Sequence, residues 1–279
     1  MASPFERLTL ITGSETAEAL QKTRVIVVGL GGVGSWCAEA LVRSGVGNIS
    51  IVDFDTVCVT NINRQVQATS KSVGRLKAEV LKERLTEINP LCEVKAFPNF
   101  FASDDNSPAE LFDFSSADYI IDAIDILKTK LDLIETALTM KKRLFSSMGM
   151  ALRLDPTLIK TADIWKTKGC SLARLVRQGL KKRKVYGRFM TVYSEERLSN
   201  RPPGLPDAAE SSAEPDAKTD AEVKPQLQAH TPFGKKRING SAVPVTATAG
   251  MILSSLVIRD VYARFNEKPV LHQPDENRE

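Results

Sequence analysis

The chain has 279 residues, of which 42% are hydrophobic and 26% are charged, and its net charge is +4 at pH 7. This is the composition of a globular protein, so it excludes a wholly disordered chain and allows one large domain or two small ones. The four cysteines form no Cys-x-x-Cys pair. This spacing argues against a disulfide framework and against a four-cysteine zinc site, and it indicates a reducing compartment, which we expect to be the cytoplasm.

Residues 1–23 are expected to form a helical arm that leads into the first strand, because apolar residues such as Phe5 and Leu8 recur along them at helical spacing. The arm has no basic start followed by a long apolar segment, so no signal peptide is visible. Arg7 is the cation of this arm that is placed to reach another surface.

A βαβ unit is predicted over residues 25–55, where a β-branched run, a helical pattern ending at Arg43 and a second apolar run ending at Asp53 follow one another. The first strand and the helix are joined by the glycine-rich sequence GLGGVG, whose glycines are Gly29, Gly31, Gly32 and Gly34. Glycines let the backbone turn tightly and approach a phosphate, and the N–H groups of the helix N-terminus point at the anion. Asp53, about 20 positions further on, is placed to accept hydrogen bonds from a ribose. The unit therefore predicts a nucleotide site without specifying the nucleotide.

Helices and strands alternate after this unit. Residues 74–91 and 127–141 carry apolar side chains at helical spacing, whereas residues 93–97, 118–124 and 143–147 are short apolar runs typical of strands. This order predicts an α/β fold with a Rossmann-like, doubly wound and mostly parallel sheet.

The pattern changes in the region 165–198, which we interpret as a basic helix with a crossover. Strands are expected at 158–164 and 188–194, and they form a C-terminal antiparallel extension of the sheet. Between them the predicted helix 171–184 carries the cations Arg174, Arg177, Lys181, Lys182, Arg183 and Lys184. From the residues alone, this helix is either a solvated face or a surface for nucleic acid.

Residues 199–240 are rich in Pro, Ala, Asp and Glu and have almost no large apolar side chain, so we predict a flexible acidic insertion. A helix over 247–265 closes the fold. The uncharged stretch 242–258 approaches the length of a membrane span, but Pro244 and Gly250 interrupt it, and we interpret it as a buried helix packed on the sheet.

Polar side chains gather at the carboxyl ends of the predicted strands, where open parallel sheets bind ligands. The set consists of Asp53, Asp55, Asn61, Arg64, Gln65, Lys77 and Asp125. A nucleoside triphosphate needs cations on its phosphates, a ribose acceptor and a carboxylate for magnesium, and this set supplies each. Asp122 reaches the same edge, either as a ligand or as a hydrogen-bonding anchor of the strand end.

Several linked motifs resemble the ThiF/MoeB superfamily, the adenylate-forming domain of ubiquitin-activating enzymes and of bacterial sulfur-carrier activators. They are GLGGVG, IVDFDTVCVTNINRQ, GRLK and IIDAID. Within this superfamily, LDPTLIKTADIWKT and LARLVRQGLKK are similar to the tRNA threonylcarbamoyladenosine dehydratase branch. The resemblance implies one adenylate-forming domain over residues 1–279. It also implies ATP-dependent cyclisation of threonylcarbamoyladenosine beside the tRNA anticodon, through adenylation of the threonyl carboxylate.

The resemblance also implies roles for single residues. Asp53 is expected to bind the ribose, Asn61, Arg64 and Lys77 the triphosphate, and Asp125 the Mg2+ ion. Arg7 matches an arginine that such homodimers extend to the partner's nucleotide, and the basic helix is expected to bind tRNA. A sulfur-relay partner protein is compatible with the same family.

Two other functions fit part of this pattern. An adenylyltransferase that activates a sulfur-carrier or ubiquitin-like protein fits the motifs, but the basic helix and the lack of zinc cysteines disfavour it. An NAD-dependent enzyme or a non-catalytic nucleotide sensor fits the glycines, but a dinucleotide site does not need Asn61, Arg64 and Lys77.

Overall fold

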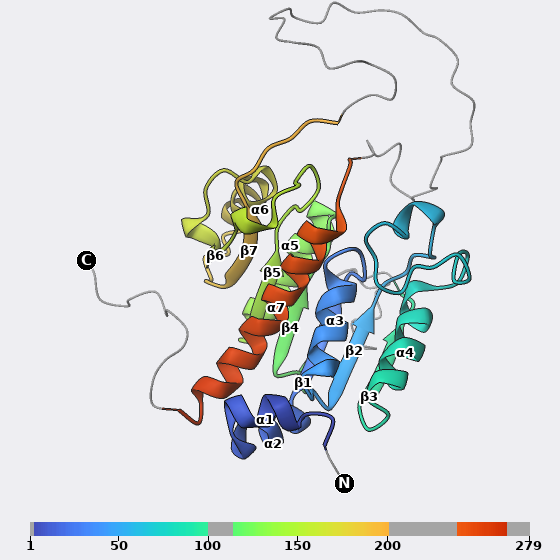
Figure 1. Ribbon diagram of the computed structural model, residues 1–279. Coiled ribbons are helices and arrows are strands. Elements are labelled where there is room, and N and C mark those ends of the chain that lie inside the picture. The colour runs from blue at the N-terminus through green and yellow to red at the C-terminus, as the bar shows by residue number, and fades with distance from the viewer. Residues whose placement is uncertain (1–2, 100–113, 201–238, 267–279) are drawn as a thin grey trace, which may run out of the picture.

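The computed structural model describes residues 3–99, 114–200 and 239–266, and Figure 1 shows them as one sheet between layers of helices. The sheet has the strand order β3-β2-β1-β4-β5-β7-β6, and all neighbouring strands are parallel except β6 and β7. The strands are β1 (Arg24–Val28), β2 (Asn48–Val52), β3 (Glu93–Phe97), β4 (Tyr119–Asp122), β5 (Arg143–Ser147), β6 (Ile159–Asp163) and β7 (Met190–Ser194). The predicted doubly wound sheet with an antiparallel extension is confirmed.

Seven α-helices surround the sheet in the described part of the chain. They are α1 (Glu6–Thr12), α2 (Ser14–Lys22), α3 (Gly34–Arg43), α4 (Lys77–Ile88), α5 (Leu127–Thr139), α6 (Ser171–Lys182) and α7 (Val243–Ala263). Side chains of α3, α4 and α7 contribute to one apolar cluster and side chains of α5 and α6 to the other. Because β1 sends Val25 and Val27 into the first cluster and Ile26 and Val28 into the second, the strand is buried on both faces, as parallel sheets require.

The register places the ends of three strands at one level. Val28 of β1 lies opposite Val52 of β2 and opposite Asp122 of β4. The residues that follow these strands, which are Gly29, Asp53 and Ala123, therefore begin their loops side by side at the carboxyl edge of the sheet. This alignment brings together segments that lie far apart in the sequence.

Helix α7 packs directly on α3, and Figure 1 shows the two helices next to each other. A Cβ atom at Gly250 would lie 2.5 Å from the Val33 carbonyl oxygen and 2.9 Å from the Cys37 nitrogen, so only glycine permits this approach. Within the described residues, α7 is the one helix long and apolar enough to cross a bilayer, and half of its most apolar window is buried. Helix α7 corresponds to the helix that the sequence predicts over residues 247–265.

Two helices begin at residues other than those predicted, and α4, α5, α6 and α7 each end two or three residues earlier than predicted. Helix α4 begins at Lys77 rather than at residue 74, because Gly74 has a φ of +88° and Leu76 is extended. Helix α7 begins at Val243 rather than at residue 247, since Pro244 occupies the first turn, where its missing N–H costs nothing. The flexibility predicted for residues 199–240 concerns a segment that lies almost wholly outside the described residues.

Candidate nucleotide site and basic surface

The glycine loop between β1 and α3 has glycines of two kinds. Gly29 has a φ of +90°, and a Cβ there would lie 2.7 Å from the Ala123 carbonyl oxygen, while a Cβ at Gly34 would overlap the Gly29 carbonyl. These two glycines are therefore required because other backbone segments of the protein pass too close for a side chain. At Gly31 a Cβ would meet no atom of the described residues within 4 Å. The loop thus leaves open space at Gly31, where a phosphate can approach the backbone.

The peptide groups of Leu30 hold this loop in place. Its N–H donates to Asp53 Oδ2 at 2.6 Å, and its carbonyl accepts a hydrogen bond from Gln67 Nε2 at 2.9 Å. Both partners are buried. Gln67 is absent from the residues predicted for the site, because a glutamine in a polar loop carries no pattern that identifies a buried contact.

Asp53 joins the glycine loop to the loop after β2. Its Oδ1 accepts a hydrogen bond from the Asp55 N–H at 2.9 Å. Burial raises the pKa of the Asp53 carboxyl, although the Lys77 charge and the two backbone N–H donors oppose this effect. A carboxylate has about four acceptor positions, so the oxygens of Asp53 retain capacity for the ribose hydroxyls predicted for them.

The polar loop after β2 places the next predicted residues beside the glycines. Asn61 is buried and its Oδ1 accepts a hydrogen bond from the Cys58 N–H at 3.1 Å, which fixes the short 3-10 turn Val59–Asn61. Gln65 is 5% exposed, and its Oε1 has no hydrogen-bond partner among the described residues. A buried acceptor without a protein donor is costly, so this oxygen is suited to accept a hydrogen bond from a bound ligand.

Arg64 lies over the glycine loop. A Cβ at Gly32 would be 3.2 Å from Arg64 Cγ, and the guanidinium Nη1 donates to the Thr60 carbonyl at 2.7 Å. The Arg64 carbonyl also accepts a hydrogen bond from Trp36 Nε1 at 3.0 Å. Partial burial lowers the pKa of the Arg64 guanidinium, and the Asp125 carboxylate opposes this shift, so the two charges act on each other across the site.

Lys77 is 5% exposed at the start of α4, and its Nζ lies 2.7 Å from Asp55 Oδ2. The N–H of Lys77 also donates to the Asp55 carbonyl at 3.0 Å, so backbone and side chain hold the pair together. A buried lysine whose partner is half-exposed keeps a positive charge directed at the edge of the sheet. The role of Lys77 on a triphosphate stays a prediction.

The second wall of the site is the turn after β4. Asp122 is fully buried, and its Oδ2 accepts hydrogen bonds from Lys130 Nζ at 2.7 Å and from Ser146 Oγ at 2.6 Å. Lys130 Nζ also donates to the Ile124 carbonyl at 2.9 Å, and Asp122 Oδ1 accepts the Ile124 N–H at 3.1 Å. Asp122 is therefore the anchor of the strand end, and the turn that it holds presents Asp125 at the surface.

Lys130 was not identified from the sequence. It lies in the predicted helix 127–141, where a lysine normally belongs to the solvated face. The available signal was its position near the start of a helix that follows directly after an acidic strand end.

The site offers one carboxylate that suits a magnesium ion. The described residues contain no group of three or more His, Cys, Asp or Glu side chains that could hold a metal alone. Mg2+ is usually bound by one or two carboxylates together with substrate phosphates, so a three-ligand cluster is not required. Asp125, which is exposed at the carboxyl edge, fits such a role.

Arg7 lies at the opposite end of the sheet. It is exposed on α1, and the neighbouring Phe5 ring faces Gly45 at the N-terminal side of β2. Figure 1 shows α1 and α2 below the sheet, away from the loop between β1 and α3. Arg7 therefore cannot reach the nucleotide site of its own chain, and its predicted role requires a second copy.

The six predicted cations of the basic helix fall into two groups. Arg174, Lys181, Lys182 and Lys184 are exposed. Arg183 forms ion pairs with Asp132 at 2.7 Å and Glu135 at 2.9 Å on α5. Arg177 donates to Thr167 Oγ1 and lies half-buried. The exposed group is available to an anion, whereas Arg177 and Arg183 fasten α6 to its neighbours.

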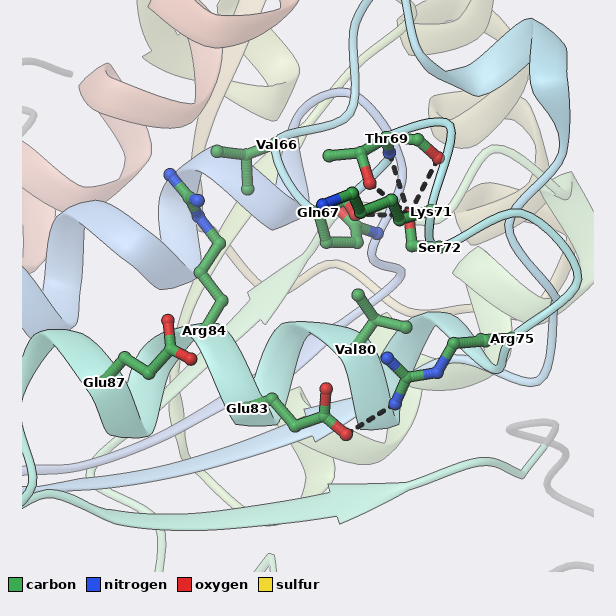
Figure 2. A pocket seen from close by; sticks show the side chains of 10 residues that line it. All are labelled: Val66, Gln67, Thr69, Lys71, Ser72, Arg75, Val80, Glu83, Arg84 and Glu87. Atoms are coloured by element: carbon green, nitrogen blue, oxygen red, sulfur yellow. Dashed lines mark hydrogen bonds and ion pairs between the residues drawn. The ribbon is translucent and has the colours of Figure 1, made fainter.

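A separate pocket lies behind the polar loop, between residues 66–75 and α4 (Figure 2). Its volume is about 200 Å³, which is below the range of roughly 300–1,000 Å³ typical of ligand sites. Its arginines are engaged, Arg75 with Glu83 and Arg84 with Glu39. This pocket is thus not the nucleotide site, although Gln67 lines it and connects it to the glycine loop.

Known proteins are similar to this chain in sequence and in structure. The model of the ThiF family matches residues 5–270. A tRNA threonylcarbamoyladenosine dehydratase from Bacillus subtilis is 41% identical over 196 residues, which are 70% of this chain and 76% of the relative. The crystal structure of the Escherichia coli tRNA N6-threonylcarbamoyladenosine dehydratase in complex with ATP has a TM-score of 0.74 at 31% identity, over 95% of this chain and 96% of that one.

The sulfur carrier protein adenylyltransferase of Thermus thermophilus is a more distant relative. It is 36% identical over 132 residues, which are 47% of this chain and 47% of the relative. The similarity to the dehydratases extends over more of the chain and is stronger. The chain therefore belongs to the ThiF family, in its branch of tRNA threonylcarbamoyladenosine dehydratases.

Proposed function

We propose that this protein uses ATP to cyclise threonylcarbamoyladenosine beside the anticodon of tRNA. An oxygen of the threonyl carboxylate attacks the α-phosphorus of ATP, and the bond to pyrophosphate breaks. The carbamoyl group of the same nucleoside then attacks the activated acyl carbon, the ring closes, and AMP leaves with the oxygen that the carboxylate has lost. The nucleoside thus loses one water in total, and no protein nucleophile is needed because proximity is supplied within the substrate.

The observation that carries this proposal is the loop around Gly31. Its neighbouring peptide is clamped by Asp53 on one side and by Gln67 on the other, while the space in front of Gly31 stays open. A preorganised backbone beside open space is suited to hold phosphate oxygens in one geometry. The related E. coli enzyme is described in complex with ATP, which supports the same ligand here.

The cations around the loop have a defined task in this reaction. Negative charge builds up on the departing pyrophosphate, and Arg64 and Lys77 are positioned to stabilise it, with Asn61 and Gln65 as polar contacts. Since Arg64 and Lys77 are already held by Thr60 and Asp55, little reorganisation is required when the charge develops. Asp125 would hold Mg2+, which supplies further neutralisation of the phosphates.

The complete site is proposed to need a homodimer. Arg7 is remote from the nucleotide loop of its own chain but exposed on α1, so a second copy can bring its Arg7 to this loop. The basic helix α6 is proposed to contact the tRNA backbone through its exposed cations. The cytoplasmic location and a sulfur-relay partner stay predictions.

The test is mass spectrometry of nucleosides from threonylcarbamoyl-modified tRNA after incubation with the purified protein, ATP and Mg2+. We expect the modified adenosine to lose one water, with AMP and pyrophosphate formed in equal amounts. Asp125→Asn keeps the size of the side chain but removes its charge, so this variant is expected to fold normally and to form little product. No mass change with wild-type protein that binds ATP would refute the dehydratase function and favour a protein carboxylate as the substrate.

A further inference from the structure

The segment from Trp165 to Arg188 is rich in exposed cations. None of its residues is acidic. Its exposed cations, here named the basic surface, are Lys166, Lys168, Arg174, Lys181, Lys182, Lys184 and Arg188. Three acidic side chains that approach it are paired with other cations: Asp132 and Glu135 on α5 with Arg183, and Glu195, which lies against Gly169, with Lys160 at 3.0 Å. These carboxylates therefore do not neutralise the exposed charges. This density of uncompensated charge attracts a polyanion.

The basic surface starts at the same edge of the sheet as the nucleotide loop. A Cβ at Gly149, two residues after the end of β5, would lie 3.6 Å from Leu172 in the first turn of α6. The helix runs from there to Lys182, which is roughly 18 Å at 1.5 Å per residue. A polyanion that enters the nucleotide site can therefore continue along α6.

An aromatic ring stands at the far end of this surface. Tyr186 is 67% exposed, which is unusual for a large ring, and it stacks on Trp165 with a centroid distance of 6.5 Å and an interplanar angle of 29°. Trp165 is itself held, because its Nε1 donates to the Gly187 carbonyl at 3.0 Å. Tyr186 is thus supported from behind while most of its surface faces solvent.

The backbone around Tyr186 is also fixed. The Val185 N–H donates to the Leu180 carbonyl at 2.9 Å at the end of α6. A Cβ at Gly187 would lie 2.8 Å from Leu138 on α5, so this glycine lets the segment pack tightly against the fold. A ring that is already ordered loses little entropy when it binds a flat partner.

We propose that Tyr186 is a stacking platform for an unpaired base of the tRNA, while the basic surface contacts the neighbouring phosphates. This inference rests on the proposed function and names a recognition residue for its RNA substrate. Unpaired RNA bases are recognised by stacking on aromatic side chains, and cationic grooves with an exposed aromatic ring suit this mode. An acidic protein partner would be attracted by the charges, but it would gain nothing specific from a preorganised flat ring.

The experiment compares Tyr186→Ala, Tyr186→Phe and Lys181→Ala with wild type in tRNA binding, measured by fluorescence anisotropy over a series of salt concentrations. Tyr186→Ala is expected to weaken binding by about 5- to 150-fold, the range for loss of one stacked base. Tyr186→Phe retains the ring and is expected to bind like wild type. Tyr186→Ala should leave the slope of log K against log salt unchanged, whereas Lys181→Ala should reduce it by about one.

Two controls separate this inference from the proposed function. The ATP affinity of each variant is measured and is expected to match wild type, because Tyr186 and Lys181 lie away from the glycine loop. Thermal unfolding is measured as well, so that a loss of tRNA binding is compared only among variants that are folded at the assay temperature. If wild type binds tRNA and forms the cyclic product but Tyr186→Ala binds equally well, the stacking role is overturned and the enzymatic function stands. Equal losses in Tyr186→Ala and Tyr186→Phe would also overturn it, since the hydroxyl would then be the contact. If wild type does not bind tRNA at all, the proposed function fails first.

Discussion

The buried pair of Lys130 and Asp122 gives the sharpest prediction about stability. Both side chains have no solvent exposure, and Lys130 donates to the carboxylate and to the Ile124 carbonyl. Lys130→Met keeps the apolar length of the side chain but leaves the Asp122 charge without a cation in the interior. Breaking such a pair costs about 3–5 kcal/mol. Because a domain of this kind is stable by roughly 5–15 kcal/mol, a large part of its free energy of unfolding is expected to be lost.

The control removes both charges together. In the double variant Lys130→Met with Asp122→Asn, no uncompensated charge remains, so we expect most of the lost free energy of unfolding to return. The coupling energy between the two substitutions should then be about 2 kcal/mol or more. The Ile124 carbonyl still lacks its donor, and for this reason the turn that carries Asp125 is expected to remain looser and turnover to stay below wild type.

The measurement is urea unfolding of the four proteins of this cycle, followed by circular dichroism. A change in midpoint with a constant dependence on urea reports a change in stability alone. The reasoning would be refuted by a loss below about 1 kcal/mol for Lys130→Met, or by a double variant no more stable than the single one. Either result would mean that the ion pair of Lys130 and Asp122 does not stabilise the folded protein.

Three further predictions concern single side chains. Cys58 is the one exposed cysteine of the four, so a thiol reagent should label one thiol in the native protein and four after denaturation. ATP should slow this labelling, because Cys58 caps the turn beside the proposed nucleotide site. Labelling of a second thiol in the native protein would contradict the burial of the other three cysteines. Gly31→Ala should leave the temperature of thermal unfolding unchanged but weaken ATP binding in calorimetry, whereas Gly29→Ala should unfold at a lower temperature. If Gly31→Ala bound ATP as tightly as wild type, a phosphate position beside Gly31 would be disproved. Burial raises the pKa of Glu39, but the hydrogen bonds and charges of Arg84 and Arg43 outweigh this effect and lower the pKa below 4.5. The stability that ionised Glu39 contributes is therefore fully present above its ordinary pKa, and it is lost as the pH falls through the lowered pKa of the folded protein. Glu39→Gln should therefore be less stable than wild type by about 1–2 kcal/mol at neutral pH and by less at pH 3 in urea titrations, and a constant difference would reject the ionic origin.

The sheet and the glycine loop could be predicted because their signals are local. Short apolar runs predicted the bounds of β3 (Glu93–Phe97) and β5 (Arg143–Ser147) correctly. The glycines and Asp53 have a spacing that one βαβ unit explains. The ends of parallel strands share one edge, so the polar residues after β2 and β4 could be expected to meet.

The parts that could not be predicted depend on contacts between distant segments. The position of Lys130 after an acidic strand end is only a weak signal, because a lysine at the same place can equally belong to a solvated helix face. Gln67 likewise gains its role only when the polar loop folds against Leu30. The basic helix shows the same limit, since charge patterning does not reveal that Arg183 is paired with α5 while Lys181 faces solvent.

The packing of α7 on α3 determines when the nucleotide loop can form during synthesis. Thr246 of α7 lies 3.1 Å from the position of a Cβ at Gly32, and Gly250 touches the start of α3, so the last helix supplies the outer wall of the first functional loop. At 5–20 residues per second, a ribosome completes α7 roughly 10–40 s after α3. The nascent chain must therefore wait with an uncovered apolar face on α3, and ATP cannot assist folding until the C-terminal helix has emerged. Chains interrupted before α7 are expected to become substrates for chaperones or proteases rather than partly active enzymes.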